Sequence, residues 1–300
     1  MLATRVTPTA TPTLAAGRLV RDLVALTKPR VTLMVVLTAL GGACLAPEPI
    51  GRVRMAATLL AIALLVGSAN TLNCYLERDS DRYMARTRNR PLPAGRLQGW
   101  VGLMWGLVLA AVALPALMWS SNAITAWLGL LSVTSYVCLY TPLKRRSPWA
   151  LYVGAVPGAL PPLMGYTASH GAIAASGVCA FLLLLVWQIP HFLAIAIFRR
   201  SEYAQAGLRS LPVVAGEVVA SRHLLASIAL LIPVSGLAWW LDVGAAFSGI
   251  LSMIVAAVWL LYALWSRTRL PTRAWARRSF VSSLLYLSVV IGAIVVNTPT

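Results

Sequence analysis

The sequence predicts an all-α, polytopic membrane bundle of nine transmembrane helices, and three observations lead to this fold class. First, 59% of the 300 residues are hydrophobic and only 11% are charged, whereas a soluble domain carries about 25% charged residues. Second, apolar runs close to the roughly 20 residues that cross a bilayer recur along the chain. Third, Lys and Arg gather in alternate connections between those runs, as the positive-inside rule requires.

Nine apolar runs account for nearly all of the chain after an N-terminal arm. In order, they are Val31–Pro47, Met55–Tyr75, Gln98–Trp119, Asn122–Tyr140, Trp149–Ala168, Ile173–Phe198, Leu224–Leu241, Val243–Trp265 and Phe280–Val296. Basic, Pro-containing or Gly-containing connections separate them, although the seventh and eighth are divided only around Asp242 and Gly244. Residues 1–27 are rich in Thr and Pro, so we expect a cytoplasmic arm without fixed structure, followed by an intramembrane domain of residues 28–300.

The basic residues give the predicted bundle an orientation. With the N-terminus in the cytoplasm, all of the 25 Lys and Arg except Arg52 and Arg54 fall on the cytoplasmic side, and the C-terminus lies outside. The net charge of +17 is then a property of a protein embedded in a lipid bilayer. No soluble basic domain is left to bind nucleic acid, so we exclude that class of partner.

An acidic segment follows the second run, with Asn73, Glu77 and Asp81 spaced at i, i+4 and i+8. On a helix, the second and third side chains are rotated by about 40° and 80° from the first, over roughly 12 Å. Asp79 lies about 200° from Glu77 and is expected to point away. Carboxylate and amide oxygens can supply part of a Mg²⁺ shell and leave positions for phosphate oxygens. We therefore predict a metal–diphosphate site; the alternative is that these acids neutralise the neighbouring arginines in a solvated loop.

Three further segments add candidate groups. Glu202 and Tyr203 lie in a second acidic connection, after the sixth run, where a carboxylate could face the first segment. Tyr140 and Lys144 could grip a diphosphate leaving group, or they are an interfacial Tyr and an ordinary cytoplasmic Lys. His191 lies inside the sixth run, where an ionisable side chain suggests a function; the alternative is a His that is hydrogen-bonded within the bundle core.

Several motifs together resemble the UbiA-type intramembrane prenyltransferases, whose pattern includes NxxxDxxxD after the second helix. Within that superfamily, the chain resembles the protohaem IX farnesyltransferases. The motifs are LTKPRVT (Leu26–Thr32), RTRNRPLPAG (Arg86–Gly95), YTPLKRRSP (Tyr140–Pro148), GALPPLMGY (Gly158–Tyr166), WQIPHF (Trp187–Phe192), EYAQAGLRSLPVV (Glu202–Val214) and ARRSFVSSLLYLS (Ala276–Ser288). The resemblance thus covers nearly the whole chain beyond the N-terminal arm.

This resemblance implies both the arrangement of the helices and the roles of the candidate residues. The nine helices would surround a central cavity that the acidic loops cap. The cofactor would be Mg²⁺, and the implied metal ligands are Asn73, Glu77, Asp81 and Glu202. The implied catalytic residues are these four together with Tyr140 and Lys144. The implied substrate-binding residues are Arg86, Arg90, Arg145, His191 and Tyr203.

The implied reaction transfers a farnesyl group from farnesyl diphosphate to the 2-vinyl group of haem B, with addition of water. The products would be haem O and diphosphate, in the haem A and O biosynthesis that serves terminal oxidases. Farnesyl diphosphate and haem B are the expected partners, with a haem A synthase or a terminal-oxidase assembly as a further one. Because the N-terminal arm is a poor presequence, we expect a bacterial inner membrane and not a mitochondrial one.

Two departures from the family pattern keep other functions open. The family usually has Asp where this chain has Glu77 and Glu202, and each extra methylene moves a carboxylate outward by roughly 1.5 Å. Since Mg²⁺ requires a tight octahedron, a non-catalytic haem chaperone is one alternative. A related prenyltransferase that acts on a quinone precursor or a chlorophyll is another. A transporter is disfavoured, because the acids gather at the cytoplasmic face and not at the midplane.

Overall fold

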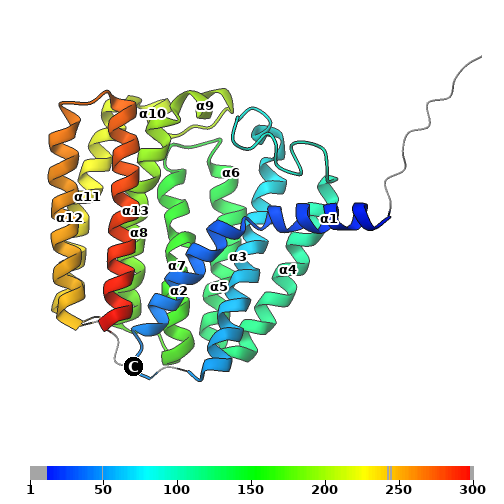
Figure 1. Cartoon of the computed structure of the whole chain (residues 1–300), viewed down its shortest axis with the longest axis horizontal. Helices are drawn as coiled ribbons and strands as arrows, with labels where there is room; N and C mark the ends of the chain where they lie inside the picture. Colours follow the sequence, from blue (N-terminus) through cyan, green and yellow to red (C-terminus); the bar gives the residue numbers. More distant parts are fainter. Residues whose placement is uncertain (1–11, 49, 242, 244, 298–300) are drawn as a thin grey trace, which may run out of the picture.

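The computed structural model describes residues 12–48, 50–241, 243 and 245–297, which form helices and turns but no strand (Figure 1). The elements are α1 (Pro12–Leu26), α2 (Pro29–Cys44), α3 (Arg52–Asp81), α4 (Gly99–Ser120), α5 (Ala123–Thr134), η1 (Ser135–Tyr140), α6 (Thr141–Leu143), α7 (Ala150–His170), α8 (Ala175–Phe198), α9 (Arg200–Gln205), α10 (Leu211–Val214), α11 (Gly216–Trp240), α12 (Ala245–Arg267) and α13 (Thr272–Asn297). The predicted all-α class is confirmed.

The expected count of nine spans is not confirmed. In the described part of the chain, seven helical stretches are long and apolar enough to cross a membrane, and the pair α1 and α2, bent by 47°, would make an eighth. These seven do not include α7, which takes the place of the fifth expected run. Three prolines and several small residues lower the hydropathy of α7, and most of its residues are buried against other helices. A helix that is covered by protein needs no apolar surface toward lipid.

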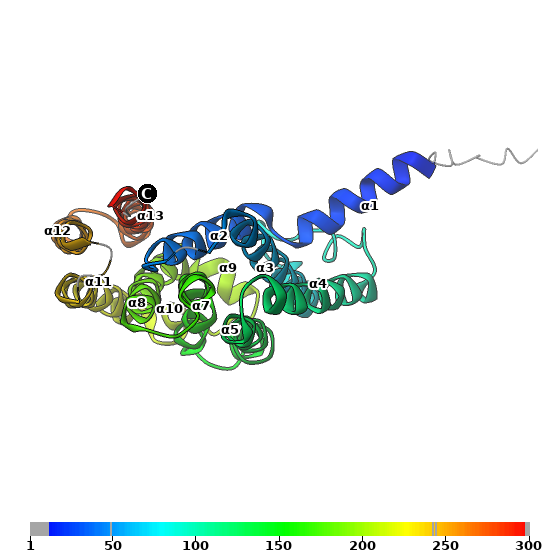
Figure 2. The same cartoon turned by 90° about the horizontal axis from the view of Figure 1, so that it is seen from below.

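Helix α7 contacts α2 backbone to backbone. A Cβ atom at Gly165 would collide with the carbonyl group of Ala39, and one at Gly42 would collide with that of Pro162. Small residues let membrane helices approach this closely, and the gain is van der Waals packing along both backbones. Figure 2 shows α2, α7 and α8 between two outer groups, with α11 to α13 on one side and α3 and α4 on the other.

Two apolar clusters follow this division. One joins α8, α11, α12 and α13 around fully buried side chains such as Leu193, Leu224 and Trp275. The other joins α3, α4, α5 and α7 around Ile62 and Leu117. We call α2 to α7 the N-terminal half and α8 to α13 the C-terminal half.

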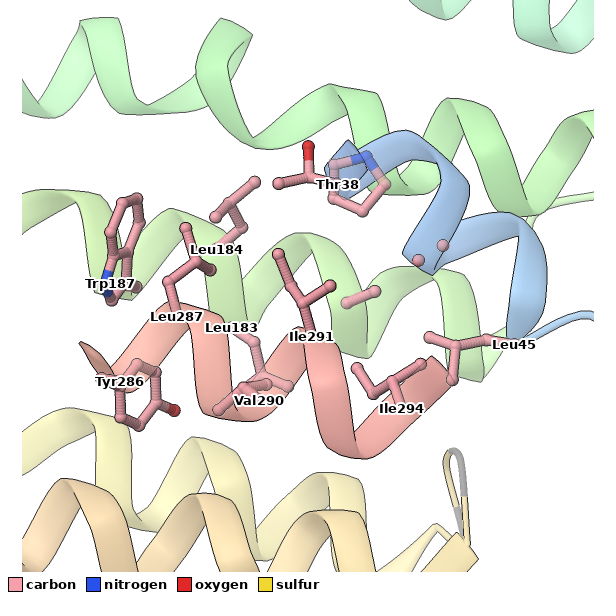
Figure 3. Close-up of a pocket in the computed structure, with 14 residues that line it drawn as sticks. Thr38, Leu45, Leu183, Leu184, Trp187, Tyr286, Leu287, Val290, Ile291 and Ile294 are labelled. Carbon is pink, nitrogen blue, oxygen red and sulfur yellow. The ribbon is translucent and has the colours of Figure 1, made fainter. Parts of the chain in front are cut away.

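An apolar pocket of about 50 Å³ lies where the two halves meet, between α2, α7, α8 and α13 (Figure 3). Trp187 is at one end of the pocket and Leu45 at the other, with Leu184 and Tyr286 near Trp187. The wider central cavity that the resemblance implies stays a prediction.

Helix α1 differs from the expected arm without fixed structure, of which residues 1–11 lie outside the described residues. Residues 12–26 are helical, and α1 extends sideways from the bundle (Figure 1). Two contacts hold its end in place. Leu26 is fully buried in a cluster with Leu92 and Leu97, and Asp22 forms an ion pair with Arg96 at 3.1 Å. Composition alone could not predict this order, because it depends on contacts with residues far along the chain.

Candidate active site

Polar side chains from four segments meet at one end of the bundle. They come from the start of α2, the end of α3, the stretch from η1 to Lys144, and α9 with the loops beside it (Figure 1). The irregular η1 turn, a π-helix, carries Tyr136 and Tyr140. Single π-helical turns inside membrane helices are frequent at functional sites.

A buried ion pair forms the centre of the site. The Lys144 Nζ atom lies 2.8 Å from the Glu77 Oε1 atom, and the two side chains are 20% and 12% exposed. Burial, the largest single effect, acts to lower the pKa of Lys144, but the Glu77 carboxylate, Tyr140 and Tyr136 together outweigh it and leave the pKa well above its ordinary value. Lys144 is therefore a fixed positive charge at neutral pH.

Asn73 connects this ion pair to a second cation. Its Oδ1 atom accepts a hydrogen bond from Lys28 Nζ at 3.0 Å, and its Nδ2 atom donates to Thr141 Oγ1 at 3.2 Å. Asn73 also bonds to the Glu77 side chain, so Lys28 and Lys144 lie at the two ends of a row that has the Asn73 amide and the Glu77 carboxylate in its middle. The row thus brings two cations from different segments to one place.

Tyr140 lies directly against this row. Lys144 Nζ is 4.4 Å from the centre of the Tyr140 ring, within the range of a cation–π contact. The ring fits only because residue 154 is Gly, since a Cβ there would overlap the ring. The predicted pair Tyr140 and Lys144 is therefore packed as one unit.

Asp81 sits at the end of α3, where it is almost completely buried. Its Oδ2 atom accepts a hydrogen bond from Arg90 Nη1 at 2.8 Å, and its backbone carbonyl accepts one from Thr87 Oγ1. Its Oδ1 atom is buried without a hydrogen-bond partner. Burying an ionised oxygen without a partner is costly, which marks this atom as a position for a cationic ligand. Asp79, expected to point away, is 64% exposed.

The second acidic connection is held differently. Glu202 pairs with Arg199 at 3.0 Å on its own segment. Burial raises the pKa of the neighbouring Tyr203, although Lys144, Arg86 and Arg199 act in the opposite direction. Tyr203 is thus a neutral hydroxyl close to Lys144 of the first site and to Arg86. A backbone hydrogen bond from Arg209 to Lys144 at 3.0 Å ties the two segments together.

The acids alone do not form a metal cage. Among the described residues, no group of three or more His, Cys, Asp or Glu side chains could hold a metal ion. Mg²⁺ nevertheless usually keeps several waters and binds through one or two carboxylates plus substrate phosphates. The Oδ1 atom of Asp81, which has no hydrogen-bond partner, fits that mode of binding, with Glu77 and Asn73 earlier on the same helix.

The remaining predicted residues lie farther out. Arg145 is exposed, and its side chain makes no hydrogen bond or ion pair with the described part of the chain. Arg86 is also exposed and approaches Tyr203 electrostatically. His191 lies in the C-terminal half, where its Nδ1 atom is 2.7 Å from Ser283 Oγ on α13.

Lys28 is a residue of the site that was not predicted from the sequence. Its backbone has φ +51°, and it is the one residue other than Gly with positive φ among those described. A non-Gly residue in that conformation is uncommon and clusters at functional sites. The available signal was the Lys-Pro dipeptide of LTKPRVT, because Pro cannot continue a helix from the preceding segment and marks a break between α1 and α2.

Comparisons with known proteins agree with this fold. The profile of the UbiA prenyltransferase family matches residues 35–285. A protoheme IX farnesyltransferase of Myxococcus xanthus is 45% identical over 92% of this chain and 94% of the relative. Another, from an Anaeromyxobacter species, is 43% identical over 91% of this chain and 92% of the relative.

Solved structures support the fold. A digeranylgeranylglyceryl phosphate synthase has a TM-score of 0.76 at 15% identity, covering 93% of this chain and 98% of the other. A UbiA homologue from Archaeoglobus fulgidus, bound to DMAPP and Mg²⁺, has a TM-score of 0.67 at 14% identity. The match covers 92% of this chain and 99% of the homologue.

Proposed function

Because the chain belongs to the UbiA prenyltransferase family, we propose that it transfers a farnesyl group from farnesyl diphosphate to the 2-vinyl group of haem B. Water adds in the same reaction, and the products are haem O and diphosphate. Support for this acceptor comes from relatives more than 40% identical that are named protoheme IX farnesyltransferase. One observation supports farnesyl diphosphate as the donor. It is the row of Lys28, Asn73, Glu77 and Lys144, on the same part of the bundle as the Asp81 oxygen that has no hydrogen-bond partner.

The diphosphate of the donor binds among the cations of the site. Lys144 and Lys28 are held in place by Glu77 and Asn73, and Arg90 is held by Asp81. These groups stabilise the charge that develops on the leaving diphosphate, as preorganised donors do in other enzymes. Arg86, Arg145 and Tyr203 approach from the outer side of the same end of the bundle.

Mg²⁺ is the cofactor that this donor set fits, with Asn73, Glu77, Asp81 and Glu202 as its candidate ligands. When bound, it neutralises phosphate oxygens as a Lewis acid. The protein's own residues do the rest. Tyr140 and Lys144 present one packed face to the allylic end of the donor, and the apolar helices below exclude water from the allylic cation that departure of diphosphate leaves.

The acceptor then completes the reaction. The haem vinyl group supplies the electron pair for the new carbon–carbon bond to the farnesyl C1 atom, and the positive charge moves to the other vinyl carbon. Water adds its oxygen there and releases one proton. Haem B, farnesyl diphosphate and water thus give haem O, diphosphate and a proton. His191 contacts the haem on the C-terminal half.

The cellular setting follows from the charge pattern. The basic connections lie at the end of the bundle that carries the site, whereas Arg54 contacts Ser120 at the other end. We infer a bacterial inner membrane with the N-terminus and the site in the cytoplasm. A haem A synthase or a terminal-oxidase assembly would take up the product.

The test is a product assay with purified protein, haem B and farnesyl diphosphate, with Mg²⁺ or with a chelator. Mass spectrometry should find a haem that has gained a farnesyl group plus water, in the Mg²⁺ sample alone. Glu77→Ala should abolish the product, whereas Asp79→Ala, which removes an exposed acid from the same helix, should leave it unchanged. Unmodified haem from folded protein with Mg²⁺ would contradict the proposal, and a prenylated quinone precursor or chlorophyll in a parallel assay would identify a related enzyme.

A further inference from the structure

A chain of hydrogen bonds joins His191 on α8 to α13. The His191 Nδ1 atom lies 2.7 Å from Ser283 Oγ, and Ser283 Oγ donates to the Phe280 carbonyl oxygen at 2.6 Å. A serine hydroxyl has one hydrogen to donate, and here the carbonyl takes it. Nδ1 must therefore be the donor to Ser283, so the neutral ring has its proton on Nδ1 and an unshared electron pair on Nε2.

The imidazole ring is also fixed in orientation. The Trp187 ring stacks on it at 4.8 Å between centroids, and the Phe280 ring lies at 4.9 Å. Trp187 Nε1 donates to the backbone carbonyl of Ser283 at 2.7 Å, which holds the serine in place from the α8 side. Both the tautomer and the direction of the ring are thus set by neighbouring groups.

The Nε2 atom of His191 is left open. Within the described residues no hydrogen bond reaches it, and His191 is partly exposed. A neutral imidazole with one nitrogen hydrogen-bonded and the other free is the form that binds metal ions, and His is a common axial ligand of haem iron. A His placed only for packing would not need its free nitrogen at an accessible surface.

We propose that the Nε2 atom of His191 is an axial ligand of the haem iron, and that the seam between α8 and α13 is the porphyrin subsite. This inference rests on the proposed function, which supplies haem as the substrate. Ser283 is a positioning residue, since it acts through the tautomer of His191. Iron ligation holds the macrocycle next to α8, and a second contact at the porphyrin edge is then needed to stop rotation about the iron–nitrogen bond and select one vinyl group.

The surroundings of His191 suit a porphyrin. Trp187, which stacks on the imidazole ring, also forms one end of the apolar pocket between the halves (Figure 3), so an apolar surface adjoins the ring. On the other side, Phe198 packs on Phe280 at 5.9 Å, and the Arg277 guanidinium lies 5.9 Å from the Phe198 ring. Arg277 is exposed and has no acidic partner among the described residues, so it is free to bind a haem propionate.

The experiment titrates ferric haem B into the full-length protein in nanodiscs, without farnesyl diphosphate, and follows imidazole ligation by absorption and electron paramagnetic resonance. His191→Ala should lose the imidazole signal and bind haem at least about tenfold more weakly. Added imidazole should restore the signal in His191→Gly. Ser283→Ala should weaken binding by about 10–100-fold, as loss of the hydrogen-bond partner of a metal-binding His does, while Ser283→Thr keeps the hydroxyl and should bind as the wild type. The control is His223→Ala, because His223 on α11 bonds to Tyr152 and not to Ser283.

Two results would overturn the inference. One is a wild-type imidazole signal and affinity in folded His191→Ala. The other is a loss of the signal in His223→Ala with no change in His191→Ala. The experiment also separates a failure of this inference from a failure of the proposed function. If only the proposed function fails, the wild-type protein ligates haem through His191 but forms no farnesylated product when Mg²⁺ and farnesyl diphosphate are present.

Discussion

The two acidic connections, one that begins in the last turns of α3 and one that follows α8, differ in how their carboxylates are held. At the end of α3, Glu77 and Asp81 are 12% and 1% exposed, and Glu77 is paired with Lys144, which directly follows α6. After α8, Glu202 is 30% exposed and pairs with Arg199 three residues away. Local, exposed pairs of this kind contribute about 0–1 kcal/mol, whereas a buried pair loses far more when one partner is removed.

This difference separates a preorganised site from an adaptable one. The first connection already holds its charges against each other before any ligand binds, so its residues can stabilise a leaving diphosphate without reorganising. The second connection can exchange a weak internal ion pair for contacts with a metal–diphosphate at low cost. We infer that the first acts in the transition state and that the second acts mainly in substrate binding.

The largest effect should come from breaking the buried pair. Lys144→Ala leaves the Glu77 carboxylate buried without its partner, which costs about 3–5 kcal/mol of folding free energy. It also removes a charge that stabilises the leaving group, so we expect kcat to fall by about 10²–10³. Product formation and thermal unfolding in detergent measure the two effects. Arg146→Ala, an exposed cation two residues away, should change neither; equal losses in both variants would mean that net charge alone matters.

A smaller effect is expected from Lys28 in the first site, where the effects on stability and on substrate binding can be separated. Lys28→Gly keeps the backbone conformation at φ +51° and relieves a strain of about 1 kcal/mol, but it removes the ammonium group. We expect unchanged or slightly higher stability together with a KM for farnesyl diphosphate raised about tenfold, the worth of one charge-assisted hydrogen bond. Steady-state kinetics and unfolding curves separate these outcomes. A variant with wild-type KM would remove Lys28 from the site.

The second connection should respond more weakly. Glu202→Ala breaks an exposed ion pair, so the free energy of unfolding should change by less than about 1 kcal/mol. If Glu202 meets the metal–diphosphate, the Mg²⁺ concentration for half-maximal rate should rise by a few-fold while kcat at saturating Mg²⁺ stays close to wild type. Glu217→Ala, which breaks the neighbouring exposed pair with Arg200, is the matched control. If kcat fell as far in Glu202→Ala as in Lys144→Ala, both connections would act in the transition state, and the distinction between them would be wrong.

Local features of this molecule could be predicted from the sequence, and contacts between distant segments could not. The helices, the exposure of Asp79 and the placement of Asn73, Glu77 and Asp81 on one helix follow from hydropathy and helical periodicity. The contact of Lys28 with Asn73 depends on the bend between α1 and α2, for which periodicity gives no signal. The hydrogen bond between His191 and Ser283 joins residues 92 positions apart. The fold of α1 depends likewise on its ion pair with Arg96.

The smallest expected effect concerns pH. The contribution of Lys144 to the free energy of unfolding should not change with pH near neutrality. The pKa of Lys144 in the folded protein lies well above its ordinary value of 10.5, because Glu77, Tyr140 and Tyr136 together outweigh burial. A raised pKa adds stability that is fully present below the unfolded value and is lost as the pH rises through the folded value. The difference in unfolding free energy between wild type and Lys144→Ala should therefore stay constant from pH 7 to about pH 10 and shrink only at higher pH. Unfolding curves at several pH values measure it, and a difference that shrinks near pH 8 would show that Lys144 deprotonates early and cannot serve as the fixed charge of the site.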